Sequence, residues 1–143
     1  MGIGPVALLE PLPEPLQAKV RALTPDMELR FPASRDVADL AAAMRGAAYV
    51  VTRAVKMPAA LLDHAPDLRL IHQWGTGTDG IPLAAARARG IPVARSPGVN
   101  AATVADLTVG LMLAASRQIP QTDAALRRGE WDQPAMWHTD PGS

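Results

Sequence analysis

The sequence predicts an α/β fold in which helices cover both faces of a parallel β-sheet. Short apolar runs alternate with Ala-rich segments of helical periodicity over roughly the first two thirds of the chain. Such alternation is typical of parallel sheets, because two neighbouring parallel strands are usually connected by a helix. Gly46 and Gly90 stand where two of the helical segments end, as expected of C-terminal helix stops.

Five strands and four helices are expected in this region. The strands are predicted at 6–10, 27–31, 48–52, 68–74 and 91–95. The helices are predicted at 14–23, 35–46, 57–66 and 81–90. The second helix has a clear apolar face, formed by Val37, Leu40, Ala41 and Met44. Pro58 suits the first turn of the third helix, where a missing N–H is tolerated.

The pattern changes after the fifth strand. Residues 96–100, SPGVN, have the composition of a hinge or linker. The helix predicted at 101–118 is apolar almost all round, and such a helix must be buried on most sides. Pro120 is expected to break it, and a short helical segment at 121–131 is expected to follow. No element is predicted in the tail, 132–143.

The composition excludes several classes of protein. The 143 residues carry a formal net charge of zero, which argues against nucleic-acid binding, because that depends on a basic excess. The absence of cysteine excludes disulfides and thiolate metal sites. The three histidines lack the spacing of metal ligands. We therefore expect neither a metal site nor a nucleic-acid partner.

The hydrophobic segments do not predict a membrane protein. The most apolar segment, 104–116, is too short to span a bilayer and contains Asp106. The N-terminus meets Pro5 and Glu10 without a basic start, unlike a signal peptide. We expect a cytoplasmic protein with no membrane partner.

A glycine-rich segment, 75-GTGTDG-80, follows the fourth strand and matches the pattern G-x-G-x-x-G. One interpretation is the phosphate-binding turn of a dinucleotide-binding fold. In that turn the helix begins near the second glycine, so Pro82 would fall inside the helix and break its hydrogen bonds. Pro82 fits better if the helix starts later, with Asp79 as its N-cap.

Two other interpretations of this segment remain. It is either a purely structural tight turn or a loop whose backbone N–H groups face a small anion. The second is favoured, because Gly75 and Gly77 let the backbone approach a ligand closely and consecutive N–H groups form a concave anion site. Ligands of parallel sheets also bind beyond the carboxyl ends of the strands, where this loop lies.

Several sequence blocks occur in a fixed order between residues 48 and 131. They are G-x-G-x-D, A-x-x-R-G-I-P-V, P-G-x-N and V-A-D. In this combination the sequence strongly resembles the D-isomer-specific 2-hydroxyacid dehydrogenases. The resemblance implies a flavodoxin-like substrate domain over 1–97. It further implies that 98–143 supplies a hinge and crossover or dimerisation helices, which lead into a nucleotide-binding domain absent from this chain. A homodimer through 101–118 is also implied.

The resemblance also assigns residues. The backbone of Thr76, Gly77 and Thr78 would bind the carboxylate of a small 2-hydroxy or 2-oxo acid. Asn100 stands where some members carry a substrate-contacting Asn, and a turn residue before the helix is the alternative. Val104 would pack near the nicotinamide of NAD or NADP, and a core position is the alternative.

Arg53 and the histidines receive no functional role. Arg53 lies one residue away from the place of a substrate-binding arginine in part of the family, so a solvated surface side chain is expected. His72 is expected to be a packed residue within its strand, and His138 lies in the tail.

The activity implied by the resemblance is hydride transfer between a D-2-hydroxy acid and its 2-oxo acid, with NAD or NADP as cofactor. The catalytic Arg, Glu and His of the family have no counterpart in this sequence. The chain is therefore expected to be the N-terminal part of such an enzyme and to be inactive alone. The alternative is a stand-alone flavodoxin-like module that binds a small carboxylate or a partner without catalysis.

Overall fold

The computed structural model describes residues 3–131 of the chain. The chain divides between Val99 and Asn100 into two compact units, and each is described by itself. The functional meaning given above to 1–97 and 98–143 stays a prediction.

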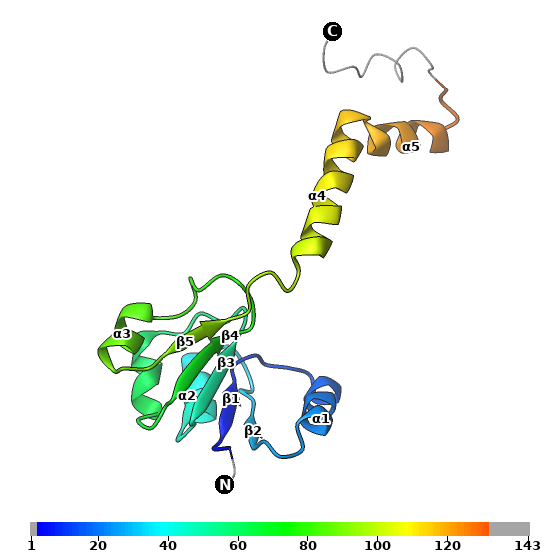
Figure 1. Cartoon of the computed structure of the whole chain (residues 1–143). Coiled ribbons are helices and arrows are strands. Elements are labelled where there is room, and N and C mark those ends of the chain that lie inside the picture. Colours follow the sequence, from blue (N-terminus) through cyan, green and yellow to red (C-terminus); the bar gives the residue numbers. More distant parts are fainter. Residues whose placement is uncertain (1–2, 132–143) are drawn as a thin grey trace. The chain divides into compact units, whose positions relative to one another are not determined.

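The first unit contains a five-stranded parallel sheet (Figure 1). Its strands are β1 (Val6–Leu8), β2 (Leu29–Arg30), β3 (Tyr49–Thr52), β4 (Leu70–Gln73) and β5 (Val93–Arg95). They lie in the order β2-β1-β3-β4-β5, and every pair is parallel. All five predicted strands are confirmed, although each is shorter than predicted, because only part of each apolar run enters the ladder.

Helices connect the strands in turn. They are α1 (Glu14–Leu23), α2 (Val37–Met44), the 3₁₀ helix η1 (Ala59–His64) and α3 (Leu83–Ala88). Helix η1 contacts both α2 and α3, so these three form one layer. The chain moves from β1 to β2 in one direction along the sheet and from β2 to β3 in the other. Because parallel crossovers are right-handed, this reversal places α1 on the opposite face of the sheet.

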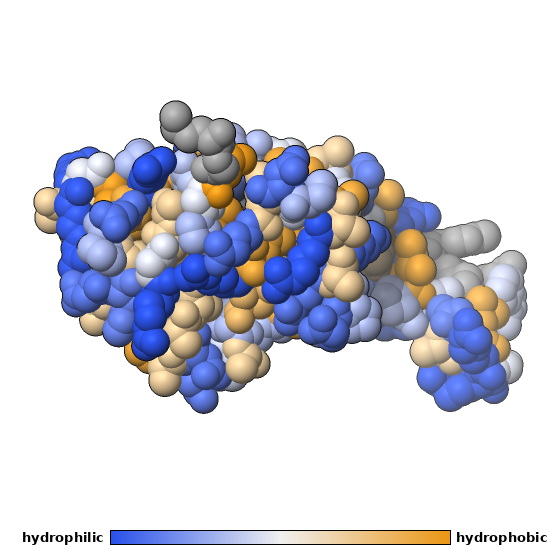
Figure 2. Space-filling model, turned by 90° about the horizontal axis from the view of Figure 1, so that it is seen from below, coloured by the Kyte–Doolittle hydropathy of each residue, from blue (hydrophilic) through white to orange (hydrophobic). Residues whose placement is uncertain are grey.

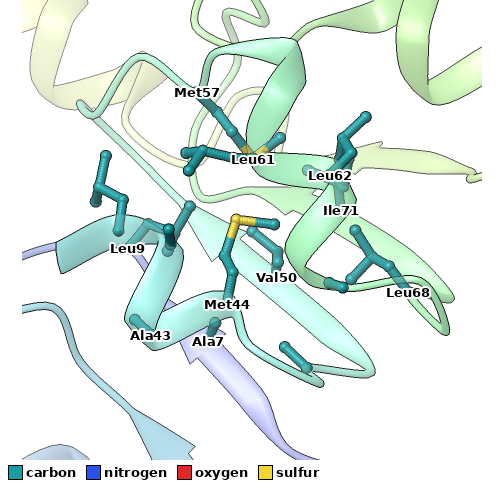
Figure 3. Close-up of a cluster of buried hydrophobic side chains, with 14 of the residues drawn as sticks. Ala7, Leu9, Ala43, Met44, Val50, Met57, Leu61, Leu62, Leu68 and Ile71 are labelled. Atoms are coloured by element: carbon teal, nitrogen blue, oxygen red, sulfur yellow. The ribbon is translucent and has the colours of Figure 1, made fainter. Parts of the chain in front are cut away.

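The core lies between the sheet and the layer of α2, η1 and α3. Figure 3 shows Met44 of α2, Val50 of β3 and Leu61 of η1 gathered there. Leu9, Leu40, Met44, Leu61, Leu62, Ile71 and Val50 are almost completely buried. Helix α1 contributes no buried residue, so the two faces of the sheet are covered unequally. Figure 2 shows hydrophilic residues interspersed with smaller apolar patches on the face that it displays.

Two predicted helix starts were wrong in detail. The segment predicted as an α-helix at 57–66 is a 3₁₀ helix that begins after Pro58, which is its N-cap rather than a residue of its first turn. Helix α3 begins at Leu83 with Pro82 as N-cap, so Asp79 is not the cap. The physical reason is a separate turn before α3, closed by a 2.9 Å hydrogen bond from the N–H of Ile81 to the carbonyl of Thr78.

The second unit contains α4 (Ala101–Ser116) and α5 (Ile119–Arg127), which contact each other. Pro120 does not break α4. The chain turns at Gln118, whose φ is 48°, and Pro120 lies in the first turn of α5, where its missing N–H is tolerated. Next to α5, the hydrogen-bonded ion pair of Arg128 and Glu130 lowers the pKa of Glu130 and raises the pKa of Arg128.

The expected burial of α4 is not met within this chain, because the helix has no buried residue. Its large apolar side chains are each more than half exposed, namely Val104, Leu107, Val109, Leu111, Met112 and Leu113. No helix of the described part of the chain is both long and apolar enough to cross a membrane.

The different burial of two leucines predicts different losses of stability when each is truncated to alanine. Leu61→Ala is expected to lower the free energy of unfolding by about 2–5 kcal/mol, because Leu61 is fully buried and its truncation leaves a cavity. Leu23→Ala, the same change at a side chain that is 75% exposed, is expected to cost about 0.5 kcal/mol or less. Urea unfolding followed by circular dichroism measures both. Equal losses would show that the core is not where the structure places it.

Candidate functional site

Two loops meet at the carboxyl edge of the sheet. Residues 53–56 follow β3 and residues 75–80 come just after β4. Because β3 and β4 are paired up to Thr52 and Gln73, the two loops start side by side. This edge is where parallel sheets bind ligands.

A pocket of about 330 Å³ lies between these loops. It is lined by Arg53, Ala54, Val55, Lys56, Gln73, Gly77, Asp79 and Gly80. Two of these side chains are cationic and one is anionic, so the lining has a net positive charge. Neither Arg53 nor Lys56 forms a salt bridge with another described residue. The pocket therefore suits a small anion better than a cation.

A larger cavity of about 820 Å³ lies between α3 and β5. Its lining is mostly apolar, and Arg87 is its one charged residue. Arg87 is its only polar side chain, whereas a specific binding site needs several polar groups that converge on the ligand. We therefore place the candidate site at the two loops.

Two carbonyl groups of the glycine loop accept hydrogen bonds from Arg95, the last residue of β5, and from Ser96, which follows it. The N–H of Ser96 donates to the carbonyl of Gly75 at 2.9 Å. The guanidinium Nη1 of Arg95 donates to the carbonyl of Thr76 at 3.3 Å. Two consecutive peptide units thus turn their oxygens toward the end of β5.

The N–H groups of the same peptides point the other way. In a trans peptide the N–H is antiparallel to the carbonyl of the preceding residue, and the structure has no cis peptide in its described part. The N–H groups of Thr76 and Gly77 therefore face away from β5. Within residues 3–131 neither of them donates a hydrogen bond. Two adjacent N–H groups without a protein partner are available to an anionic ligand.

This geometry does not fit a dinucleotide-binding turn. Ile81 and Pro82 separate the last glycine from the start of α3. In the dinucleotide-binding turn the third glycine lies inside the helix and packs against the strand. The glycines at 75–80 instead form an open loop before the helix, as the favoured interpretation of the sequence requires.

The loop 53–56 is fixed by a residue that the sequence analysis missed. The carboxylate Oε1 of Glu10 accepts hydrogen bonds from the N–H groups of Arg53, Ala54 and Val55 at 3.0, 2.6 and 3.2 Å. Glu10 directly follows the first apolar run and lies two residues beyond the end of β1, the strand that pairs with β3. An acidic residue at the end of a buried strand was the available signal.

The two loops are also joined to each other. The N–H of Met57 donates to the carbonyl of Gly80 at 2.8 Å. A Cβ atom on Gly80 would lie 3.2 Å from the carbonyl oxygen of Val55, closer than most such contacts. Glycine at position 80 thus permits the close approach of the two loops.

The remaining predicted residues fall in different places. Asn100 is the N-cap of α4, but its side chain makes no capping hydrogen bond. Val104 lies in the first turn of α4 and is 51% exposed. Both belong to the second unit, whereas Thr76, Gly77 and Thr78 belong to the first. The binding roles of all five stay predictions.

Of the side chains given no functional role, Arg53 and His72 lie within the described residues, and their lack of a role stays a prediction. Arg53 is exposed. His72 is half-buried in β4, and its Nε2 lies 3.0 Å from Oγ of Ser96. His138 lies outside the described residues. Among residues 3–131 no three His, Asp or Glu side chains are grouped so as to hold a metal ion.

The sequence is similar to that of known enzymes over most of its length. Residues 6–140 match the family model described as the D-isomer specific 2-hydroxyacid dehydrogenase catalytic domain. D-3-phosphoglycerate dehydrogenase of Methanocaldococcus jannaschii is 44% identical over 84 residues, or 59% of this chain and 16% of that protein. The enzyme of that name from Mycobacterium tuberculosis is 37% identical over 122 residues, or 85% of this chain and 23% of that protein.

Solved structures show the same likeness. The 2-hydroxyacid dehydrogenase of Ketogulonicigenium vulgare Y25 is 32% identical with a TM-score of 0.74, over 92% of this chain and 41% of that one. The NADPH-dependent glyoxylate/hydroxypyruvate reductase of Sinorhizobium meliloti, in complex with NADP and malonate, is 32% identical with a TM-score of 0.71, over 89% of this chain and 39% of that one. The chain thus spans well under half of each relative. With the family model matched along most of its length, the chain belongs to the D-isomer-specific 2-hydroxyacid dehydrogenase family.

Proposed function

We propose that this chain forms the substrate-binding part of an NAD(P)-dependent oxidoreductase that interconverts a small D-2-hydroxy acid and its 2-oxo acid. The observation that carries the proposal is the pair of N–H groups of Thr76 and Gly77, which face away from β5 with their carbonyls held by Ser96 and Arg95. Every substrate of this class has a carboxylate, and this loop is suited to bind one.

The chemistry of the loop supports a carboxylate rather than a neutral ligand. A carboxylate accepts hydrogen bonds from backbone N–H groups, and such charge-assisted bonds are stronger than neutral ones. The guanidinium of Arg95, bonded to the carbonyl of Thr76, adds positive charge next to the same peptide. Thr78 would contribute a third N–H to the carboxylate.

Binding at this loop would position the substrate for the reaction. Holding the carboxylate fixes the neighbouring carbon, which carries the hydroxyl or oxo group, and such positioning lowers the barrier of the chemical step. Asn100 would be a second substrate contact, and Val104 would pack against the nicotinamide.

NAD or NADP would supply the hydride acceptor or donor. The described residues do not fit a dinucleotide phosphate, since the glycines at 75–80 precede α3 as an open loop. In this proposal the cofactor is therefore bound mainly by other parts of the enzyme. The 143 residues alone bind the acid and do not carry out turnover.

We also propose that two copies associate through 101–118. Support comes from the large apolar side chains of α4, all of them more than half exposed in a single chain. Contiguous exposed apolar side chains of this kind often mark a surface that binds another protein.

Carboxylate binding predicts a specific pattern of NMR shifts. Titration of the ¹⁵N-labelled chain with malonate is expected to move the amide signals of Thr76 and Gly77 most, because these N–H groups would donate to the ligand. Malonamide, which has the same shape without charge, serves as the control ligand. Shifts spread over unrelated surfaces, or equal shifts with malonamide, would contradict the proposal.

The same sample, given NADH and glyoxylate, is expected to show no oxidation of NADH.

Arg95 is expected to strengthen this binding. Arg95→Met should weaken malonate affinity about threefold to fivefold, since an exposed charge contributes about 1 kcal/mol or less. The difference from the unchanged protein should shrink as salt is added, because screening weakens exposed charges. Arg87→Met, the same change on α3, is the matched control and should leave the affinity unchanged. Isothermal titration calorimetry measures all three proteins, and equal losses in both variants would rule out a local role for Arg95.

Association through α4 predicts a dependence on its apolar surface. The chain is expected to sediment as a dimer or larger species. Leu111→Glu should shift it toward the monomer, because it places a charge within the apolar surface. Leu23→Glu, on α1, should not change the mass. A monomeric unchanged protein at high concentration in sedimentation equilibrium would refute the proposal.

A further inference from the structure

The buried polar side chains of the described residues share one target. There are three of them, Glu10, Thr52 and Gln73. Glu10 accepts from the N–H groups of 53–55. Thr52 Oγ1 donates to the carbonyl of Val55 at 3.1 Å, and Gln73 Nε2 donates to the carbonyl of Arg53 at 2.8 Å. All three therefore bond to one short loop, which forms a wall of the candidate pocket.

Glu10 makes the strongest of these contacts. Three consecutive N–H groups converge on its Oε1 atom, whereas its Oε2 atom lies 3.8 Å from Arg35, a mostly exposed side chain. A buried carboxylate is costly unless it is hydrogen-bonded. If the loop moved outward, this carboxylate would lose its main partners. Glu10 and the loop conformation therefore depend on each other.

The contacts of the loop extend beyond Glu10 to the glycine loop. Met57 donates its N–H to the carbonyl of Gly80, and the carbonyl of Val55 lies against the same glycine. Glu10 is not among the residues that line the pocket. Any effect it has on a ligand must pass through the backbone of 53–57.

We propose that Glu10 is a positioning residue for the anion pocket. By binding the N–H groups of 53–55 it sets the place of Arg53 and Lys56, and through Met57 it holds the loop 75–80. This inference rests on the proposed function as far as the ligand is concerned. Its structural part, the coupling of Glu10 to the second loop, stands independently.

The test uses two substitutions and one control. Glu10→Gln keeps the shape and one acceptor oxygen but removes the charge, and Glu10→Asp withdraws the carboxylate by one methylene. Leu68→Ala is the control, because Leu68 is buried in the core and does not line the candidate pocket. Amide hydrogen exchange is followed by NMR well below the unfolding temperature, and malonate affinity is measured on the same proteins.

We expect exchange at Arg53, Ala54 and Val55 to rise about tenfold in Glu10→Asp, because the shorter side chain withdraws the acceptor from all three N–H groups. The rise should be smaller in Glu10→Gln, which loses the charge but keeps an acceptor oxygen in place. Exchange at Met57 should rise with them, and malonate affinity should fall in the same order. In Leu68→Ala the overall stability should fall while Met57 exchange and malonate affinity stay unchanged.

Two other results are informative. Faster exchange at 53–55 with no change at Met57 would overturn the inference, because Glu10 would then act only on its own partners. If the protein without substitutions bound no malonate, the proposed function would be refuted. Exchange at Met57 in the variants would still decide whether Glu10 controls the second loop.

Discussion

The buried carboxylate of Glu10, held by three backbone N–H groups, is the interaction on which the carboxyl edge of the sheet depends. It ties the end of β1 to the loop after β3. That loop in turn contacts Gly80 of the loop after β4. The segments after three neighbouring strands are thereby joined in one polar network, while the apolar core lies on one face of the sheet. The two systems share residues, because Val55 lines the candidate pocket and Met57 bonds to Gly80 while both belong to the buried core.

Most of the fold could be predicted from the sequence, because the strands and helices follow local patterns. The apolar run before Thr52 and the glycine at 46, with its φ of +67°, each act within a few residues. The errors arose where two local preferences competed. Pro58 and Pro82 were placed inside helices, but both became N-caps. A turn closed by Thr78 and Ile81 precedes α3, and before η1 the N–H of Met57 bonds to Gly80 of the other loop.

The location of the candidate site could also be predicted, but not its construction. The glycine pattern and its place after a strand pointed to an open loop. The direction of its N–H groups depends on Arg95 and Ser96, which come from another strand and the residue after it. Glu10 is separated from Arg53 by 43 residues, and no local pattern connects them. Contacts of this kind follow from the topology of the sheet, which the sequence pattern indicates only in outline.

Both edge strands of the sheet are short. β2 has two residues and β5 has three. An exposed edge strand can recruit a strand from another molecule, and short edges are one way in which proteins avoid this. The sheet therefore offers little backbone for extension across molecules. The association proposed above would accordingly be made by side chains, so substitutions on helix surfaces should affect it more strongly than changes at the sheet edges.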